Sequence, residues 1–100
     1  MNFKIKALLH IHIHSLKKNN DIYLNKELIL PFIPSKDIII HEIGKPFISI
    51  KYVLSKQLFK CYLSPIDVSS NEFIKLVDKY LNDGWTFDNP FDKELSLIHI

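Results

Sequence analysis

An alternation of apolar and polar side chains over residues 3–14 constrains the fold more than any other feature of the chain. The apolar positions include Leu9, Ile11 and Ile13, and the polar positions between and after them are His10, His12 and His14. Because successive side chains of a β-strand point to opposite faces, this period of two predicts a long strand with one buried and one polar face. The chain must therefore pair this strand within a sheet and cover the apolar face of that strand.

The residues that follow predict a β-hairpin. Asn19 and Asn20 suit a two-residue type I′ turn, because Asn tolerates positive φ angles better than other non-glycine residues. This turn predicts a second strand over residues 22–32 and places His12 opposite Glu27. We expect these two side chains to form a hydrogen bond across the hairpin.

Sequence patterns in the rest of the chain predict more strands and one helix. Further strands are expected over residues 38–40, 47–54, 58–63 and 95–100, the first five strands forming an antiparallel meander. Ser69 and Glu72 match a helix capping box, and Gly84 suits the end of a helix, so a helix is predicted over residues 71–83. We therefore expect one α+β domain over residues 1–100. It is a twisted antiparallel sheet or small open barrel of five to six strands, with one C-terminal helix packed on it.

Composition disfavours several classes of function. The chain has 100 residues, 47% of them hydrophobic, which is the usual size of one domain. All 13 basic residues are lysines. Arginine makes the paired hydrogen bonds that recognise phosphate groups and guanine edges, so its absence disfavours sequence-specific binding of nucleic acid. The two glycines are far apart, so there is no glycine-rich phosphate loop. Cys61 lies in an apolar run and is predicted to be a buried structural thiol. These features predict a non-enzymatic cytoplasmic protein, with no membrane-spanning segment.

The histidine face offers metal ligands as an alternative interpretation. Side chains two apart on a strand are about 7 Å apart at their roots, and those of His10 and His14 are about 13 Å apart. Zinc–nitrogen bonds measure about 2.0–2.1 Å, so at most two neighbouring histidines can share one ion. The alternative site combines His10 and His12, or His12 and His14, with a third ligand. The candidates for that ligand are Glu27, His41 and His99. The favoured interpretation has no metal and no other cofactor, the histidines simply lining a polar strand face.

Binding of another macromolecule is the favoured function. Two lysines extend the histidine face, and the predicted docking surface is formed by Lys4, Lys6, His10, His12, His14 and Glu27. The expected partner is a protein, with a homo-oligomer or a metal- or nucleic-acid-binding domain as alternatives. In composition, a short arginine-free domain without catalytic motifs resembles accessory proteins of phages and mobile elements. Some of those inhibit bacterial defence nucleases or other macromolecular machines.

Overall fold

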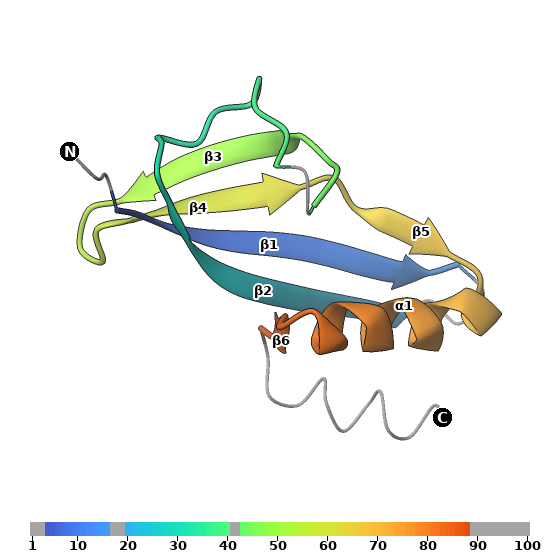
Figure 1. Ribbon diagram of the computed structural model, residues 1–100. Coiled ribbons are helices and arrows are strands. Elements are labelled where there is room, and N and C mark those ends of the chain that lie inside the picture. Colours follow the sequence, from blue (N-terminus) through green and yellow to red (C-terminus); the bar gives the residue numbers. More distant parts are fainter. Residues whose placement is uncertain (1–3, 17–19, 41–42, 89–100) are drawn as a thin grey trace. The chain divides into compact units, whose positions relative to one another are not determined.

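The computed structural model describes residues 4–16, 20–40 and 43–88, which form six strands and one helix (Figure 1). The elements are β1 (Ile5–Ser15), β2 (Asn20–Leu30), β3 (Phe47–Val53), β4 (Leu58–Leu63), β5 (Ile66–Val68), α1 (Ser70–Asn82) and β6 (Thr86–Phe87). The strands form one sheet in the order β3-β4-β1-β2-β6, and β5 pairs with β1. The α+β class is therefore confirmed, with an open and mostly antiparallel sheet. The strand expected over residues 95–100 lies outside the described residues.

The chain forms two compact units that share β1 and β2. Unit 1 comprises residues 1–10 and 26–64, and unit 2 comprises residues 11–25 and 65–100. Each unit thus contains one part of β1 and one part of β2. The assignment of all 100 residues to one domain stays a prediction.

Unit 1 is organised around β4, which pairs with strands on both sides. It is antiparallel to β3 and parallel to β1, where Leu9 lies opposite Cys61. The buried side chains of unit 1 include Ala7, Leu9, Leu30, Phe47, Cys61 and Leu63. The predicted antiparallel meander is therefore wrong at β4, because an apolar alternation defines the faces of a strand and not its neighbours.

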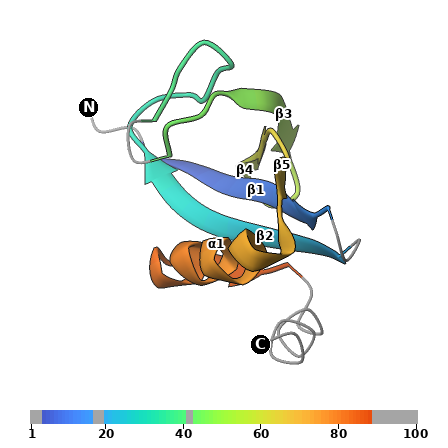
Figure 2. The ribbon, with the colours of Figure 1, turned by 90° about the vertical axis from the view of Figure 1, so that its right-hand side faces the viewer.

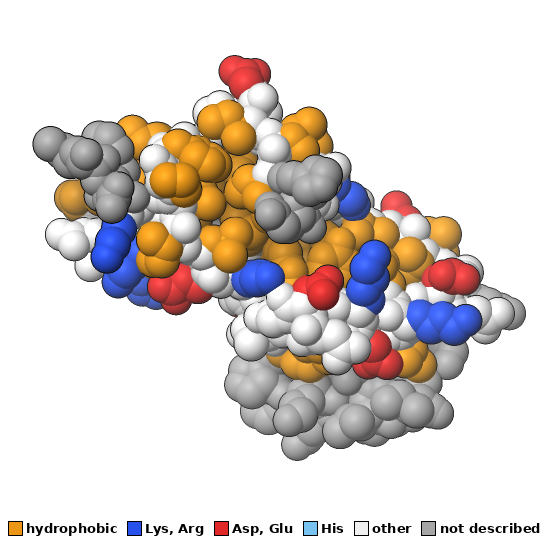
Figure 3. Space-filling view, viewed as in Figure 1, with side chains coloured by type: hydrophobic (Ala, Val, Ile, Leu, Met, Phe, Trp, Pro, Cys, Tyr) orange, Lys and Arg blue, Asp and Glu red, His pale blue; other side chains and the backbone are white. Residues whose placement is uncertain are grey.

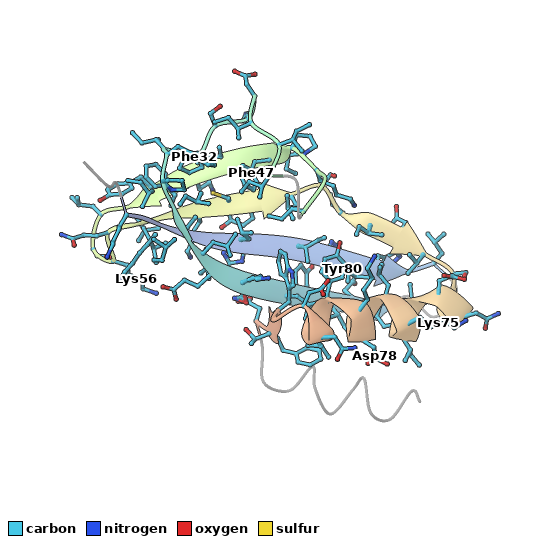
Figure 4. The ribbon with its side chains drawn as sticks, viewed as in Figure 1. Phe32, Phe47, Lys56, Lys75, Asp78 and Tyr80 are labelled. Atoms are coloured by element: carbon cyan, nitrogen blue, oxygen red, sulfur yellow. The ribbon has the colours of Figure 1, made fainter. Side chains whose placement is uncertain are left out.

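The strand predicted over residues 38–40 is also absent from the described part of unit 1. Only an isolated bridge joins Ile39 to Pro46. Proline has no N–H group to donate, so a ladder cannot continue through Pro46. The described residues between β2 and β3 are otherwise irregular, and Phe47 at the start of β3 is buried (Figure 4).

Unit 2 buries the apolar face of the hairpin against α1. The helix lies along the strands (Figure 2), and its spacing of apolar residues places one face toward them. The buried apolar side chains are Ile11, Ile13, Ile22, Leu24, Phe73, Val77 and Trp85. On the outer side of the helix Lys75 and Asp78 are exposed (Figure 4). The predicted inward face of β1 is thus confirmed, and the histidines lie on its other face.

The helix ends close to the predicted positions. Ser69 is the N-cap residue in extended backbone, but its side chain makes no capping hydrogen bond, so that part of the capping-box prediction is wrong. The backbone carbonyl of Ser69 accepts from the N–H groups of Glu72 and Phe73 instead. At the other end Gly84 has a positive φ of 95°, and the Trp85 N–H donates to the Tyr80 carbonyl at 3.0 Å. This reversal of the chain after α1 confirms the predicted termination.

Replacing Gly84 with alanine is expected to destabilise the protein. An L-residue at positive φ brings its Cβ against the backbone, at a cost of about 1–2 kcal/mol in the free energy of unfolding. Urea unfolding followed by circular dichroism measures the change, with Asn82→Ala on the exposed helix surface as the control. Equal stability of the Gly84→Ala variant and the parent chain would contradict this account of the helix end.

Candidate functional site

In unit 2 two histidines of β1 converge on one carboxylate of β2. His12 Nε2 lies 2.6 Å from Asp21 Oδ1, and His14 Nδ1 lies 2.7 Å from the same oxygen. An ionised carboxylate can only accept hydrogen bonds, so both ring nitrogens donate. Because side chains alternate along β1, these histidines point away from its buried face. Asp21 lies on β2, and its side chain lies between the two imidazole rings. The result is a cluster of three titratable groups, which we call the His-Asp cluster.

An aromatic ring supports the His-Asp cluster. Tyr23 stacks on His12, with ring centroids 4.5 Å apart and an interplanar angle of 13°. His14 meets His12 edge-on, with centroids 6.2 Å apart. Because Tyr23 covers one face of the His12 imidazole, it restricts the orientation of that ring.

The predicted contact between His12 and Glu27 is therefore wrong. The partners of His12 are Asp21 and Tyr23, and Tyr23 lies four residues before Glu27 in β2. Apolar side chains alternate along β2, so a shift by an even number of residues leaves the same face buried. Hydrophobic patterning could not separate the two registers, and the predicted Asn19-Asn20 turn was misplaced, because Asn20 already belongs to β2.

Hydrogen bonding sets the electrostatics of the His-Asp cluster. The pKa of Asp21 lies below its ordinary value of 3.8, chiefly because His12 and then His14 hydrogen-bond to its carboxylate. A carboxyl group whose pKa is lower in the folded state stabilises the fold above the unfolded pKa. This contribution is lost as the pH falls below 3.8 toward the folded pKa. It is reduced by solvent screening, because the Asp21 side chain is 41% exposed.

The low pKa of Asp21 can be measured directly. An NMR titration of its side-chain carboxyl carbon is expected to give a pKa below 3.8. In a His12→Gln, His14→Gln double variant the pKa should rise, because neutral amide donors stabilise the carboxylate less than imidazoles do. His10→Gln is the matched control and should leave the titration unchanged. A pKa of Asp21 that is the same in the double variant and the parent would contradict the hydrogen bonds.

In unit 1 the third histidine of β1 has a different environment. His10 stacks on Tyr62 of β4, with ring centroids 4.8 Å apart and an interplanar angle of 15°. The Lys51 ammonium lies 5.9 Å from the centre of the Tyr62 ring, within the range of a cation–π interaction. Lys51 is opposite Lys60, and Lys60 is opposite Leu8 on β1. His10 and Tyr62 thus form an aromatic platform beside two lysines.

The structure divides the predicted docking surface between the two units. Unit 1 contains Lys4, Lys6, His10 and Glu27, and unit 2 contains His12 and His14. Of the proposed third metal ligands, Glu27 is not among the cluster that lies around His12 and His14, and Asp21 takes its place. His41 and His99 lie outside the described residues. Sequence reasoning missed Asp21 because of the misplaced turn, and missed Tyr62, Lys51 and Lys60 because β4 pairs with a strand distant in sequence.

Cys61 is the structural thiol that its apolar surroundings predicted. Its side chain is fully buried in unit 1. Burial raises the pKa of Cys61 from 9.0 to about 11, because a thiolate is poorly solvated there. The thiolate is the nucleophilic form of cysteine, so this residue is suited to packing and not to covalent catalysis.

Comparison with protein-family models, with curated proteins and with solved structures gives no match for this chain. Among residues 4–16, 20–40 and 43–88, no helix has the length and apolar character needed to cross a membrane. The surfaces of the two units are therefore the basis for a functional proposal.

Proposed function

We propose that this protein is a non-enzymatic binding domain whose unit 1 docks on an acidic surface of another protein. The distribution of charge supports this. Unit 1 contains eight lysines and three acidic residues, a formal charge of +5, whereas unit 2 contains five lysines and eight acidic residues, a formal charge of −3. The net charge of +2 for the whole chain conceals this difference.

The lysines of unit 1 accompany a preformed contact surface. Lys6 and Lys51 are exposed, and Lys60 is half-buried beside the stacked rings of His10 and Tyr62. A positively charged patch attracts an acidic surface over a distance and orients the encounter. Stacked rings add area that loses little conformational freedom on binding, because their side chains are already held.

Exposed apolar side chains favour a protein over a nucleic acid as the partner. Six of the eight large hydrophobic side chains that are exposed in the described residues belong to unit 1: Ile29, Ile33, Ile39, Ile48, Tyr52 and Leu54. Hydrophobic side chains also lie at the surface around β3 and the connection before it (Figure 3). A phosphate backbone gains nothing from aliphatic contacts, whereas protein interfaces commonly bury exposed apolar side chains.

Within this proposal the partner is a bacterial defence nuclease or another macromolecular machine, which the protein inhibits in the cytoplasm by occupying its surface. The support is the resemblance in composition to accessory proteins of phages and mobile elements. Nucleases commonly hold their metal ions with carboxylates, and a site of that kind presents the acidic surface that unit 1 would fit.

The proposal is tested by capture of the partner with matched charge variants. A Lys51→Glu, Lys60→Glu double variant reverses two charges beside the aromatic platform. It is expected to recover at least tenfold less of a stoichiometric protein partner from cells that naturally produce the chain. Lys75→Glu, on the exposed side of α1 in unit 2, is the control and should capture the same amount as the parent. Quantitative mass spectrometry measures the recovery.

Two further observations sharpen this test. Leu54→Ser removes an exposed apolar side chain from unit 1 and should also weaken capture, while circular dichroism verifies that each variant is folded. Recovery of nucleic acid in place of a protein would refute the choice of partner. Equal recovery of a protein by the parent and by the double variant would refute docking through the lysine-rich face.

A further inference from the structure

We propose that the His-Asp cluster of unit 2 is a binding site for one divalent transition-metal ion, with Zn²⁺ as the ion that its ligands suit best. The ligands are His12, His14 and Asp21. The site lies in unit 2 and does not depend on the proposed docking of unit 1. The choice of ion follows from the ligands, because two imidazoles and one carboxylate form a donor set typical of divalent transition metals.

The positions of the three ligand atoms support the site. One nitrogen from each histidine and one oxygen of Asp21 all lie within 4.8 Å of one another. The two nitrogens are already directed at the same oxygen, at 2.6 and 2.7 Å. Around tetrahedral zinc, with bonds of about 2.0–2.2 Å, ligand atoms lie about 3.3 Å apart. Widening each nitrogen–oxygen distance by less than about 1 Å, and bringing the two nitrogens from at most 4.8 Å to about 3.3 Å, gives the spacing that the ion requires.

The exposure of the cluster suits capture of an ion from solution. The side chains of His12 and His14 are 30% and 23% exposed, and that of Asp21 is 41% exposed. An ion can thus reach the ligands without unfolding of the unit, and a water molecule can complete its coordination. Asp67 on β5 is the register partner of His14, so a second exposed carboxylate lies on the same face and adds negative charge near the ion.

The hydrogen bonds of the metal-free protein hold the ligands in advance. Tyr23 stacks on His12 and restricts that ring, and the Asp21 carboxylate fixes both imidazoles. Of these contacts, the stacking of Tyr23 lies outside the ligand set and can persist when an ion binds, and it reduces the conformational freedom that the His12 ring loses. Metal binding requires a lone pair on the nitrogen that now donates to Asp21. Each neutral imidazole therefore moves its proton to the other ring nitrogen, Nδ1 in His12 and Nε2 in His14.

Calorimetry with zinc chloride tests the site. Titration of the full untagged chain at pH 7.5 should show one Zn²⁺ ion per chain. His12→Gln, His14→Gln and Asp21→Asn should each weaken binding at least tenfold. The controls are His10→Gln, which removes a histidine from the same strand face, and Asp78→Asn, which removes an exposed carboxylate from α1. Both controls should bind zinc with the affinity of the parent.

NMR of the unaltered chain gives a second test that holds even where a variant fails to fold. Zinc should shift the ¹⁵N resonances of His12 Nε2 and His14 Nδ1 and move the ring protons to the opposite nitrogens. The site is refuted by an absence of zinc binding, or by binding that leaves these resonances unchanged. Equal affinity of the parent and the Asp21→Asn variant also refutes it.

Discussion

Replacing Trp85 with alanine is expected to lower the free energy of unfolding by about 3–5 kcal/mol. Trp85 is only 5% exposed and meets Tyr80 edge-on, with ring centroids 5.3 Å apart. Its backbone N–H also ties the segment after Gly84 to the last turn of α1. Alanine would remove the largest side chain of the unit 2 core and leave a cavity. The end of α1 could fill this cavity only by moving, which would break the hydrogen bond from the Trp85 N–H to the Tyr80 carbonyl.

Urea unfolding followed by far-UV circular dichroism measures this loss, since the chain has no other tryptophan to report by fluorescence. Leu54→Ala is the control. Leu54 is 78% exposed, so its truncation should change the free energy of unfolding by less than about 0.5 kcal/mol. A loss below about 1 kcal/mol for Trp85→Ala would show that Trp85 does not pack in the core of unit 2.

The second large effect concerns the reactivity of Cys61. At pH 7.5 this thiol is expected to react with a thiol-specific reagent at least about 100-fold more slowly in the folded protein than in urea-unfolded chain. Its pKa is raised from 9.0 to about 11, and each unit lowers the thiolate fraction about tenfold. The full burial of the side chain slows the reaction further.

Labelling with a chromogenic disulfide reagent measures both rates, and a short peptide containing one cysteine corrects for the effect of urea on the chemistry. Equal rates for folded and unfolded chain would show that Cys61 is accessible, and would reopen a nucleophilic role. The pH dependence has a defined sign. Because the folded state favours the neutral thiol, stability is retained below pH 9.0 and falls as the pH rises toward 11.

The faces of β1 could be predicted from the sequence because they depend on local order alone. Leu9, Ile11 and Ile13 are buried as the alternation predicts, and α1 ends at Asn82, shortly before the positive-φ Gly84, as the turn chemistry predicts. Each of these features is decided by residues that are close together in the chain. Long-range packing stabilises the buried face of β1 and the end of α1, but it is not needed to choose them over other local structures.

The His-Asp cluster could not be predicted, because its members meet through the register of a hairpin. The sequence offered Glu27 as the partner of His12, and the structure has Asp21 and Tyr23. The pairing of β4 with β1 was missed for a related reason. This pairing joins residues about fifty positions apart, such as Leu9 and Cys61. A local sequence pattern does not show which distant strand will pair with β1, nor the entropy cost of closing so long a loop.

The shared carboxylate oxygen of Asp21 has a consequence for folding. Hairpins that slip by two or four residues bury the same apolar face, so hydrophobic burial alone would leave several pairings nearly equal in energy. Only one of them brings Asp21 to both imidazoles and Tyr23 to the His12 ring. The three polar side chains of the cluster thus add to the native hairpin contacts that a slipped hairpin with the same buried face would lack.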